Sequence, residues 1–200
     1  MEKPLGISGR IAAGFQRNAI TPLLALVLLL AGIFATLIAL VRDNVPVLGV
    51  IYAPESDVLY WAVRGHGAFK EVNGEVHPIS AMHHEHDQPD SLVVAISRRQ
   101  KLENLTRRLN PAINYELIPL GSSSLKSCLV AEGAADCYVR LGPTGEWDTA
   151  AAQCIVEAAG GRILSLALQP LSYNETESLE NPDFIGMGDP DLAWGSILAH

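Results

Sequence analysis

Cysteine and basic residues are both scarce in this chain. Three cysteines among 200 residues cannot form a disulfide framework. Cys128 and Cys154 fall in apolar helical patterns, which predicts buried thiols. Fourteen Lys and Arg stand against 22 Asp and Glu, a formal net charge of −8. Recognition of a nucleic-acid backbone needs clustered Lys and Arg, so we expect no nucleic-acid binding.

The acidic residues are unevenly distributed. Residues 1–43 carry a net charge of +2, and residues 44–200 carry −10. This balance does not exclude a small phosphorylated substrate, because bound divalent cations can supply the positive charge such a ligand needs. The chain shows no internal repeat, and its length suits one domain preceded by a short N-terminal segment.

A long uncharged run distinguishes the N-terminal segment. Residues 18–41 contain no charged side chain, and a helix of that length can cross a bilayer core of about 30 Å. We therefore predict a transmembrane helix over about 19–41 that contacts membrane lipid. Lys3, Arg10 and Arg17 precede the run, so the positive-inside rule predicts an inner-membrane protein with a cytoplasmic N-terminus.

The remainder, residues 44–200, alternates short β-rich runs with helical patterns. Such alternation predicts an α/β fold of packed layers. The expected strands cover 47–53, 58–63, 65–70, 72–79, 92–96, 113–118, 136–140 and 162–165, and the expected helices 101–109, 122–132 and 149–159.

One acidic residue stands at a distinctive helix start. The sequence Leu-Gly-Pro-Thr-Gly-Glu-Trp-Asp-Thr-Ala-Ala at 141–151 places Asp148 where a Pro/Gly turn passes into an apolar helix. Read by itself, Asp148 is either an ordinary helix cap or a ligand for a hard cation or a neighbour of a bound phosphate.

Several short sequence strings decide between Asp148 as a helix cap and Asp148 as a ligand-binding residue. From about residue 45 onward the chain resembles the second half of the CysQ-type 3'(2'),5'-bisphosphate nucleotidases of the inositol monophosphatase superfamily. The matching strings occur in family order: Pro-Val-Leu-Gly-Val-Ile-Tyr-Ala-Pro at 46–54, Gly-His-Gly-Ala-Phe at 65–69, Ala-Ile-Ser-Arg at 95–98, Leu-Gly-Ser-Ser-Ser-Leu-Lys at 120–126, Leu-Val-Ala-Glu-Gly at 129–133, Gly-Glu-Trp-Asp-Thr-Ala-Ala at 145–151 and Glu-Ser-Leu-Glu-Asn-Pro at 177–182.

The resemblance implies a fold, a reaction and a set of site residues. The fold is the C-terminal half of the layered α+β sugar-phosphatase fold. The reaction removes the 3'-phosphate of adenosine 3',5'-bisphosphate with Mg²⁺ as cofactor. Asp148 would be the catalytic and metal-binding carboxylate. The substrate-binding residues would be Ser97, Arg98, Gly121, Ser123, Ser124, Lys126 and Asp148.

Other expected family features are missing. The family's Glu-Glu pair and its Asp-Pro-x-Asp-Gly-Thr metal signature do not precede residue 46. Residues 1–43 instead resemble the N-terminal membrane segment of resistance-nodulation-division efflux pumps. Two hypotheses stay open: a Mg²⁺-dependent phosphatase, or a non-catalytic membrane-anchored fragment or chimera whose fold a partner chain could complete. The family is cytoplasmic, whereas the predicted topology exports residues 44–200, and the sequence does not resolve this conflict.

A histidine-rich tract offers a further metal-site hypothesis. His-His-Glu-His-Asp at 83–87 has the composition of an adventitious zinc or nickel site. The tract falls where the resembled family has a variable loop, which favours a solvated segment.

Overall fold

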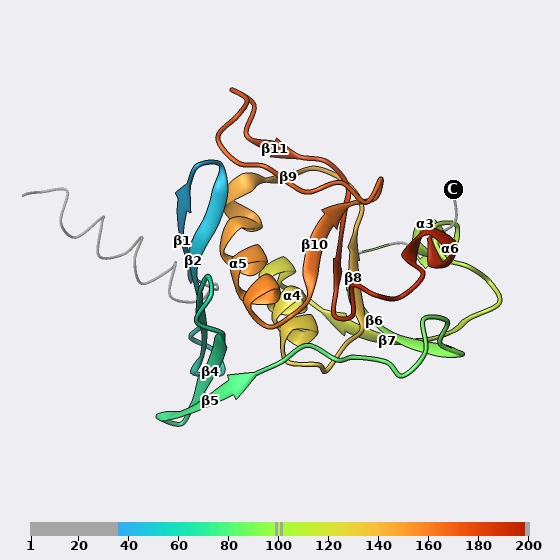
Figure 1. Ribbon diagram of the computed structural model, residues 1–200, viewed down its shortest axis with the longest axis horizontal. Helices are drawn as coiled ribbons and strands as arrows, with labels where there is room; N and C mark the ends of the chain where they lie inside the picture. Colours follow the sequence, from blue (N-terminus) through green and yellow to red (C-terminus); the bar gives the residue numbers. More distant parts are fainter. Residues whose placement is uncertain (1–35, 99, 101, 199–200) are drawn as a thin grey trace, which may run out of the picture. The chain divides into compact units, whose positions relative to one another are not determined.

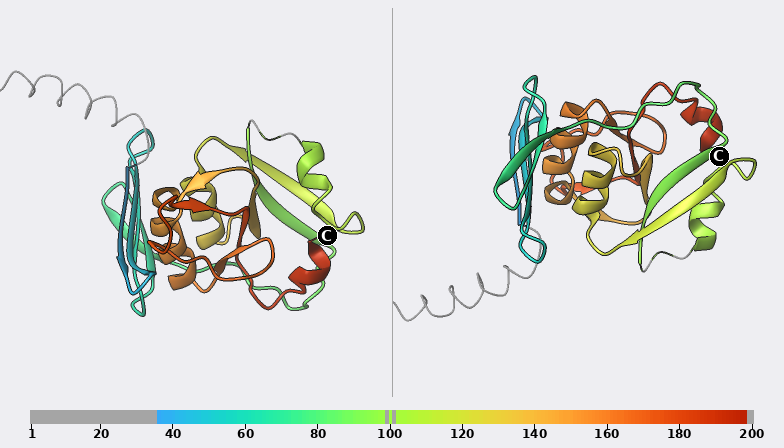
Figure 2. Two further views of the ribbon diagram at one scale, coloured as in Figure 1. Left: turned by 90° about the horizontal axis from the view of Figure 1, so that it is seen from above. Right: turned by 90° about the horizontal axis from the view of Figure 1, so that it is seen from below.

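Two five-stranded sheets, with helices α4 and α5 between them, form the described part of the protein. The structure is a computed structural model and describes residues 36–98, 100 and 102–198. Figure 1 shows the helices beside both sheets, and Figure 2 shows the first sheet edge-on against α5. The expected α/β layering is confirmed.

The first sheet is an antiparallel meander in the order β1-β2-β3-β4-β5. Side chains that face α5 alternate with side chains on the opposite face, because successive strand residues point to opposite sides. Asp43 and Asn44 make the β1–β2 turn with positive φ angles of 50° and 64°, which Asp and Asn tolerate better than most residues. The strands are β1 (Thr36–Arg42), β2 (Val45–Ala53), β3 (Val58–Val63), β4 (Ala68–Val72) and β5 (Glu75–Ile79).

Helix α5 (Ala150–Ala158) lies directly against β2. A Cβ atom added to Gly49 would lie 2.3 Å from the backbone oxygen of Ala151. No side chain fits at that point, so glycine permits the helix and strand backbones to approach. Ile51 and Ala62 continue the buried face of the sheet on either side of this contact.

The second sheet has the order β10-β12-β8-β6-β7, and its strand β6 runs parallel to both β7 and β8. One face packs on α4 and α5, and the other packs on Leu105, Trp194 and Ile197. Its elements and the helices beside it are β6 (Ser91–Ser97), α3 (Leu102–Thr106), β7 (Asn114–Leu120), α4 (Ser123–Ala131), β8 (Cys137–Arg140), β10 (Arg162–Ser165), β12 (Phe184–Met187) and α6 (Trp194–Ile197).

The predicted membrane helix is wrong where the structure describes it. Residues 36–41 lie in β1, and β1 pairs with β2 along its whole length. Residues 19–35 lie outside the described residues, as does most of the segment that resembles an efflux pump. Among the described helices, none is long and apolar enough to span a membrane. The sheet starts at Thr36, ahead of residue 44 where the sequence placed the start of the domain.

Several element boundaries also differ from expectation. Gly65 and Gly67 have positive φ angles, so β4 starts at Ala68 rather than residue 65, and the hairpin that follows turns at Asn73-Gly74, whose φ angles are also positive. Strand β12 and the short pair β9 (Thr144–Gly145) and β11 (Glu180–Asn181) were not predicted. The cysteine prediction is confirmed: Cys128 and Cys154 are buried free thiols, and burial raises the pKa of each.

Candidate functional site

The site lies where the three parallel strands of the second sheet end. Ser97 closes β6, Leu120 closes β7 and Arg140 closes β8. Carboxyl ends of parallel strands meet at one edge of a sheet, and in α/β proteins that edge is where ligands bind. Arg98 directly follows β6 and is exposed.

The loop after β7 leads into the first turn of α4. Gly121 is exposed, and Ser122 caps the helix by accepting a hydrogen bond from the Leu125 backbone N–H at 3.3 Å. The Ser123 hydroxyl lies 2.9 Å from the Tyr138 hydroxyl. Ser124 is buried within the helix, so its hydroxyl faces protein rather than the loop surface. The loop thus offers Gly121 and Ser123, rather than Ser124, to a ligand.

Lys126 occupies an unusual position beneath this loop. Its side chain is 1 % exposed, and its ammonium donates to the carbonyls of Ser122 at 2.7 Å and Leu120 at 3.3 Å. The same ammonium lies 4.9 Å from the centre of the Tyr138 ring. Burial, followed by the nearby charges of Arg140 and Arg98, lowers the pKa of Lys126 to about 8. Lys126 therefore holds the loop and adds positive charge from below, rather than extending into solvent.

Arg140 is a site residue that the sequence did not reveal. It is half-buried, and its Nε has no hydrogen-bond partner among the described residues, although its Nη2 donates to the Pro143 carbonyl at 3.3 Å. Burying a guanidinium N–H without a partner is costly, so an anion at this point would satisfy it. The only sequence signal was its position at the end of the predicted strand 136–140.

Asp148 is the carboxylate of the site, and it lies close enough to Tyr138 to affect the pKa of that phenol. It ends the short 3₁₀ helix η1 (Glu146–Asp148), is half-buried, and accepts a hydrogen bond on Oδ2 from the Gly145 backbone N–H at 3.1 Å. The surroundings of Tyr138 include both Arg140 and Asp148. Burial is the largest cause of its raised pKa, the Ser123 and Arg140 side chains lower that pKa, and the Asp148 carboxylate raises it.

The structure thus brings together Arg98, Ser123, Lys126 and Asp148 from the predicted set and adds Tyr138 and Arg140. Mg²⁺ is usually held by one or two carboxylates with water and phosphate oxygens. Asp148 fits one such ligand. Among the described residues, no three His, Cys, Asp or Glu side chains are grouped to hold a metal ion.

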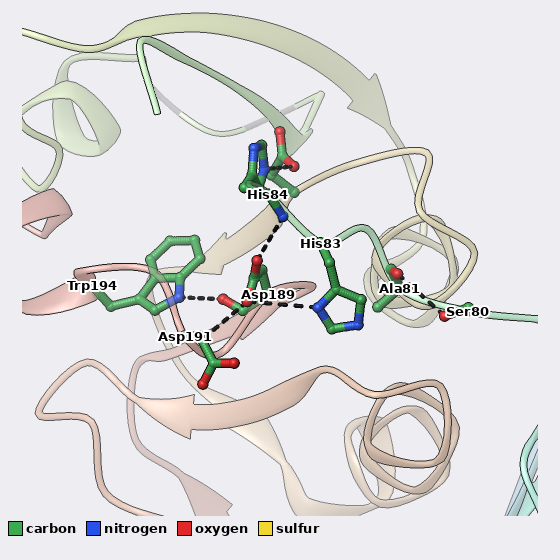
Figure 3. Close-up of polar contacts among 8 residues, drawn as sticks. Ser80, Ala81, His83, His84, Asp189, Asp191 and Trp194 are labelled. Atoms are coloured by element: carbon green, nitrogen blue, oxygen red, sulfur yellow. Dashed lines mark hydrogen bonds and ion pairs between the residues drawn. The ribbon is translucent and has the colours of Figure 1, made fainter. Parts of the chain in front are cut away.

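The histidine-rich tract forms structural contacts in place of a metal centre. His84 Nε2 lies 2.7 Å from Asp136 Oδ1, and the His84 backbone N–H donates to Asp189 Oδ2 at 2.7 Å. Figure 3 shows Asp189 between His83 and His84, with the Trp194 indole donating to the Asp189 backbone carbonyl. Hydrogen bonds from His84 and Asp191 outweigh the effect of burial and lower the pKa of Asp189. These contacts tie the tract to the second sheet.

Comparison with known proteins gives a consistent result. The model of the family described as "Inositol monophosphatase family" matches residues 29–188. The 3'(2'),5'-bisphosphate nucleotidase CysQ of Aggregatibacter actinomycetemcomitans is 42% identical over 167 residues, covering 84% of this chain and 61% of the relative. The CysQ of Haemophilus influenzae is 43% identical over 165 residues, covering 82% of this chain and 61% of the relative.

A solved structure shows the same fold. The crystal structure of CysQ from Bacteroides thetaiotaomicron, a bacterial member of the inositol monophosphatase family, has a TM-score of 0.67 and 38% identity. The match covers 78% of this chain and 63% of that one. The chain therefore spans about 61% of the length of the curated relatives that it matches.

The same comparisons correct the predicted location. The family match begins at residue 29, inside the run 18–41 that had been interpreted as a membrane span. From residue 36 this run forms a strand of the first sheet. The inner-membrane localisation that depended on this run is therefore wrong.

Proposed function

Because the chain belongs to the inositol monophosphatase family, we propose that it hydrolyses the 3'-phosphate of adenosine 3',5'-bisphosphate. Water attacks the phosphorus, the bond to the ribose 3'-oxygen breaks, and AMP and inorganic phosphate result. The CysQ relatives support this substrate class by name. The observation that carries the proposal is the cationic group at the strand ends, because a bisphosphate nucleotide needs several positive charges in a small volume.

The cationic group consists of Arg98, Lys126 and Arg140. Lys126 is fully buried and Arg140 is half-buried, in a chain whose net charge is −8. Placing three cations close together lowers the stability of the fold, because the charges repel one another and lose contact with water. Burial, followed by the charges of Arg140 and Arg98, lowers the pKa of Lys126 in line with that cost. A phosphorylated ligand would offset it.

Each residue then has a distinct role in the proposal. Arg98 and Arg140 bind phosphate oxygens, while Gly121 and Ser123 line the loop that receives the nucleotide, and Ser97 supports this edge. Lys126 holds the loop through the Leu120 and Ser122 carbonyls. Asp148 would hold Mg²⁺, which when bound polarises the phosphoryl group and favours an attacking water. Tyr138 orients the Ser123 hydroxyl.

Replacing Arg140 tests the cationic group. We expect Arg140→Gln to weaken binding of adenosine 3',5'-bisphosphate about 10-fold to 100-fold, because a charge-assisted hydrogen bond contributes about 1.5–3 kcal/mol. Isothermal titration calorimetry measures the change. Arg107→Gln, an exposed arginine after α3, is the matched control and should bind like the parent. Equal binding by both variants would contradict the proposal.

The same site should respond to pH through Lys126. Its folded-state pKa of about 8 lies below that of an exposed lysine, so Lys126 loses its proton first in the folded protein. We expect nucleotide affinity to fall as pH rises through about 8, while stability toward unfolding rises between about 8 and 10.4. Titrations from pH 7 to 9.5 measure the affinity. Lys126→Met should remove the fall in affinity near pH 8. A fall of unchanged size in that variant would assign the titration to another group.

A second candidate is a non-catalytic member of the family that requires a partner chain. The outward face of the first sheet favours it: among the described residues Ile38, Leu40 and Val76 are 58%, 57% and 51% exposed. A separate polypeptide that supplies the remaining part of the family fold would cover this face and provide further metal ligands. Nucleotide binding without phosphate release would favour this candidate.

A further inference from the structure

The turn that carries Asp148 is held in place by a strand that is distant in sequence. Strand β11 (Glu180–Asn181) pairs antiparallel with β9 (Thr144–Gly145), which directly precedes η1. The Leu179 carbonyl also accepts a hydrogen bond from the Glu146 backbone N–H at 2.9 Å. The segment after residue 173 therefore sets the position of the turn that carries the proposed metal carboxylate.

The side chain of Asn181 adds hydrogen bonds to this strand pairing. It is 7% exposed, and its Nδ2 donates to the Gly145 carbonyl at 2.8 Å and to Thr149 Oγ1 at 3.0 Å. One of these acceptors lies just before η1 and the other just after it. Both protons of one amide group therefore connect the two ends of the turn that contains Asp148.

The link to Asp148 runs through a single residue, Gly145, whose two flanking peptide groups make one hydrogen bond each. Gly145 accepts from Asn181 with its carbonyl and donates from its N–H to Asp148 Oδ2 at 3.1 Å. Fixing the Gly145 carbonyl restricts rotation of this residue, and its N–H in turn orients the carboxylate. The oxygen that remains, Oδ1, is then presented in one direction.

The neighbouring hydroxyl of Tyr173 does not duplicate this function. Tyr173 Oη lies 2.7 Å from Gln153 Oε1 and 3.2 Å from Thr149 Oγ1, but a phenol has only one proton to donate. The shorter contact, to Gln153, takes it. The Tyr173 hydroxyl bonds to Thr149 and Gln153 and not to Gly145, so it stabilises α5 rather than the start of the turn.

From this geometry we propose that Asn181 is a positioning residue that orients the Asp148 carboxylate for its ligand. The inference rests on the proposed function, because that function gives Asp148 a metal ion to hold. Partners that orient a metal ligand typically contribute about 10-fold to 100-fold in metal affinity or activity. Asn181 is buried and touches no proposed substrate-binding residue, so its effect must pass through the turn.

The experiment compares Asn181→Leu with Tyr173→Phe in the full chain. Both remove buried polar groups that contact Thr149, but only the first removes the donor to Gly145. NMR measures hydrogen exchange of the Gly145 amide, and phosphate release measures the half-saturating Mg²⁺ concentration. We expect Asn181→Leu to speed exchange about fivefold to tenfold, as loss of one hydrogen bond implies. We also expect half-saturating Mg²⁺ to rise about tenfold.

Tyr173→Phe should leave both quantities within about twofold of the parent while lowering the melting temperature, as loss of one neutral hydrogen bond would. Asn181→Ser, which disturbs packing less, should show the same direction of change if Asn181→Leu does not fold. Identical exchange in the Asn181 and Tyr173 variants would overturn the inference. A parent that releases no phosphate would contradict the proposed function, and the Gly145 exchange measurement would still decide the role of Asn181.

Discussion

We expect Asp148→Asn to lower Mg²⁺-dependent release of phosphate from adenosine 3',5'-bisphosphate by about 10³-fold, since a metal ion contributes several kcal/mol to such reactions. The substitution keeps the size of the side chain and can still accept a hydrogen bond from Gly145. It removes the carboxylate to which the proposed function gives the metal ion. The loss should therefore appear in turnover and in Mg²⁺ dependence, with little change in folding.

Asp87→Asn provides the matched control for this measurement. Asp87 is exposed in the segment between the two sheets, and its backbone carbonyl accepts a hydrogen bond from the Ala193 backbone N–H. This variant should release phosphate at the parent rate. If Asp148→Asn also retained the parent rate, Asp148 would have no catalytic role. If the parent showed no release at all, the described carboxylates would be insufficient and the partner-dependent candidate would gain support.

The largest effect on stability is expected from Gly49→Ala. The new methyl group would meet the Ala151 backbone oxygen at 2.3 Å, and backbone cannot rotate away as a side chain can. Helix α5 or strand β2 must therefore shift. We expect the free energy of unfolding to fall by about 3 kcal/mol, at the upper end of overpacking effects in cores. Urea denaturation followed by circular dichroism measures this change.

The same substitution should also affect the site, because α5 starts two residues after Asp148. A shift of its first turn would move Asp148 relative to Arg140 and Lys126. Gly195→Ala is the control: nothing lies within 4 Å of a Cβ atom there, so its stability should stay within about 0.5 kcal/mol of the parent. Equal stability of Gly49→Ala and the parent would show that α5 does not pack as closely as described.

The first strand shows why sequence alone misplaced one element. Residues 36–41 belong to an uncharged apolar run, and a run of this kind fits either a membrane helix or a buried strand. Pairing with β2 decides the matter, because each residue of β1 finds a partner there. β2 follows β1 directly across the Asp43-Asn44 turn, and the hydropathy of residues 18–41 alone does not include this partner strand.

Arg140 and Asn181 were missed for a similar reason. Arg140 ends a short β-rich string and Asn181 lies in a polar stretch, and both patterns are ordinary for solvated positions. Arg140 gains its importance from the parallel arrangement that brings the ends of β6, β7 and β8 together. Asn181 gains its importance from the pairing of β11 with β9 across 36 residues.

The sequence by itself determined the family, the α/β class and the turn that presents Asp148, because these depend on short strings whose chemistry is local. A Pro/Gly turn followed by an apolar helix places Asp148 at a helix start in any compact fold. Tertiary structure alone decided that residues 36–41 of the apolar run enter a sheet, that Lys126 is buried beneath its loop, and that Arg140 completes the cationic group. These features depend on which strands pair and on what packs around each side chain, and no local pattern specifies this.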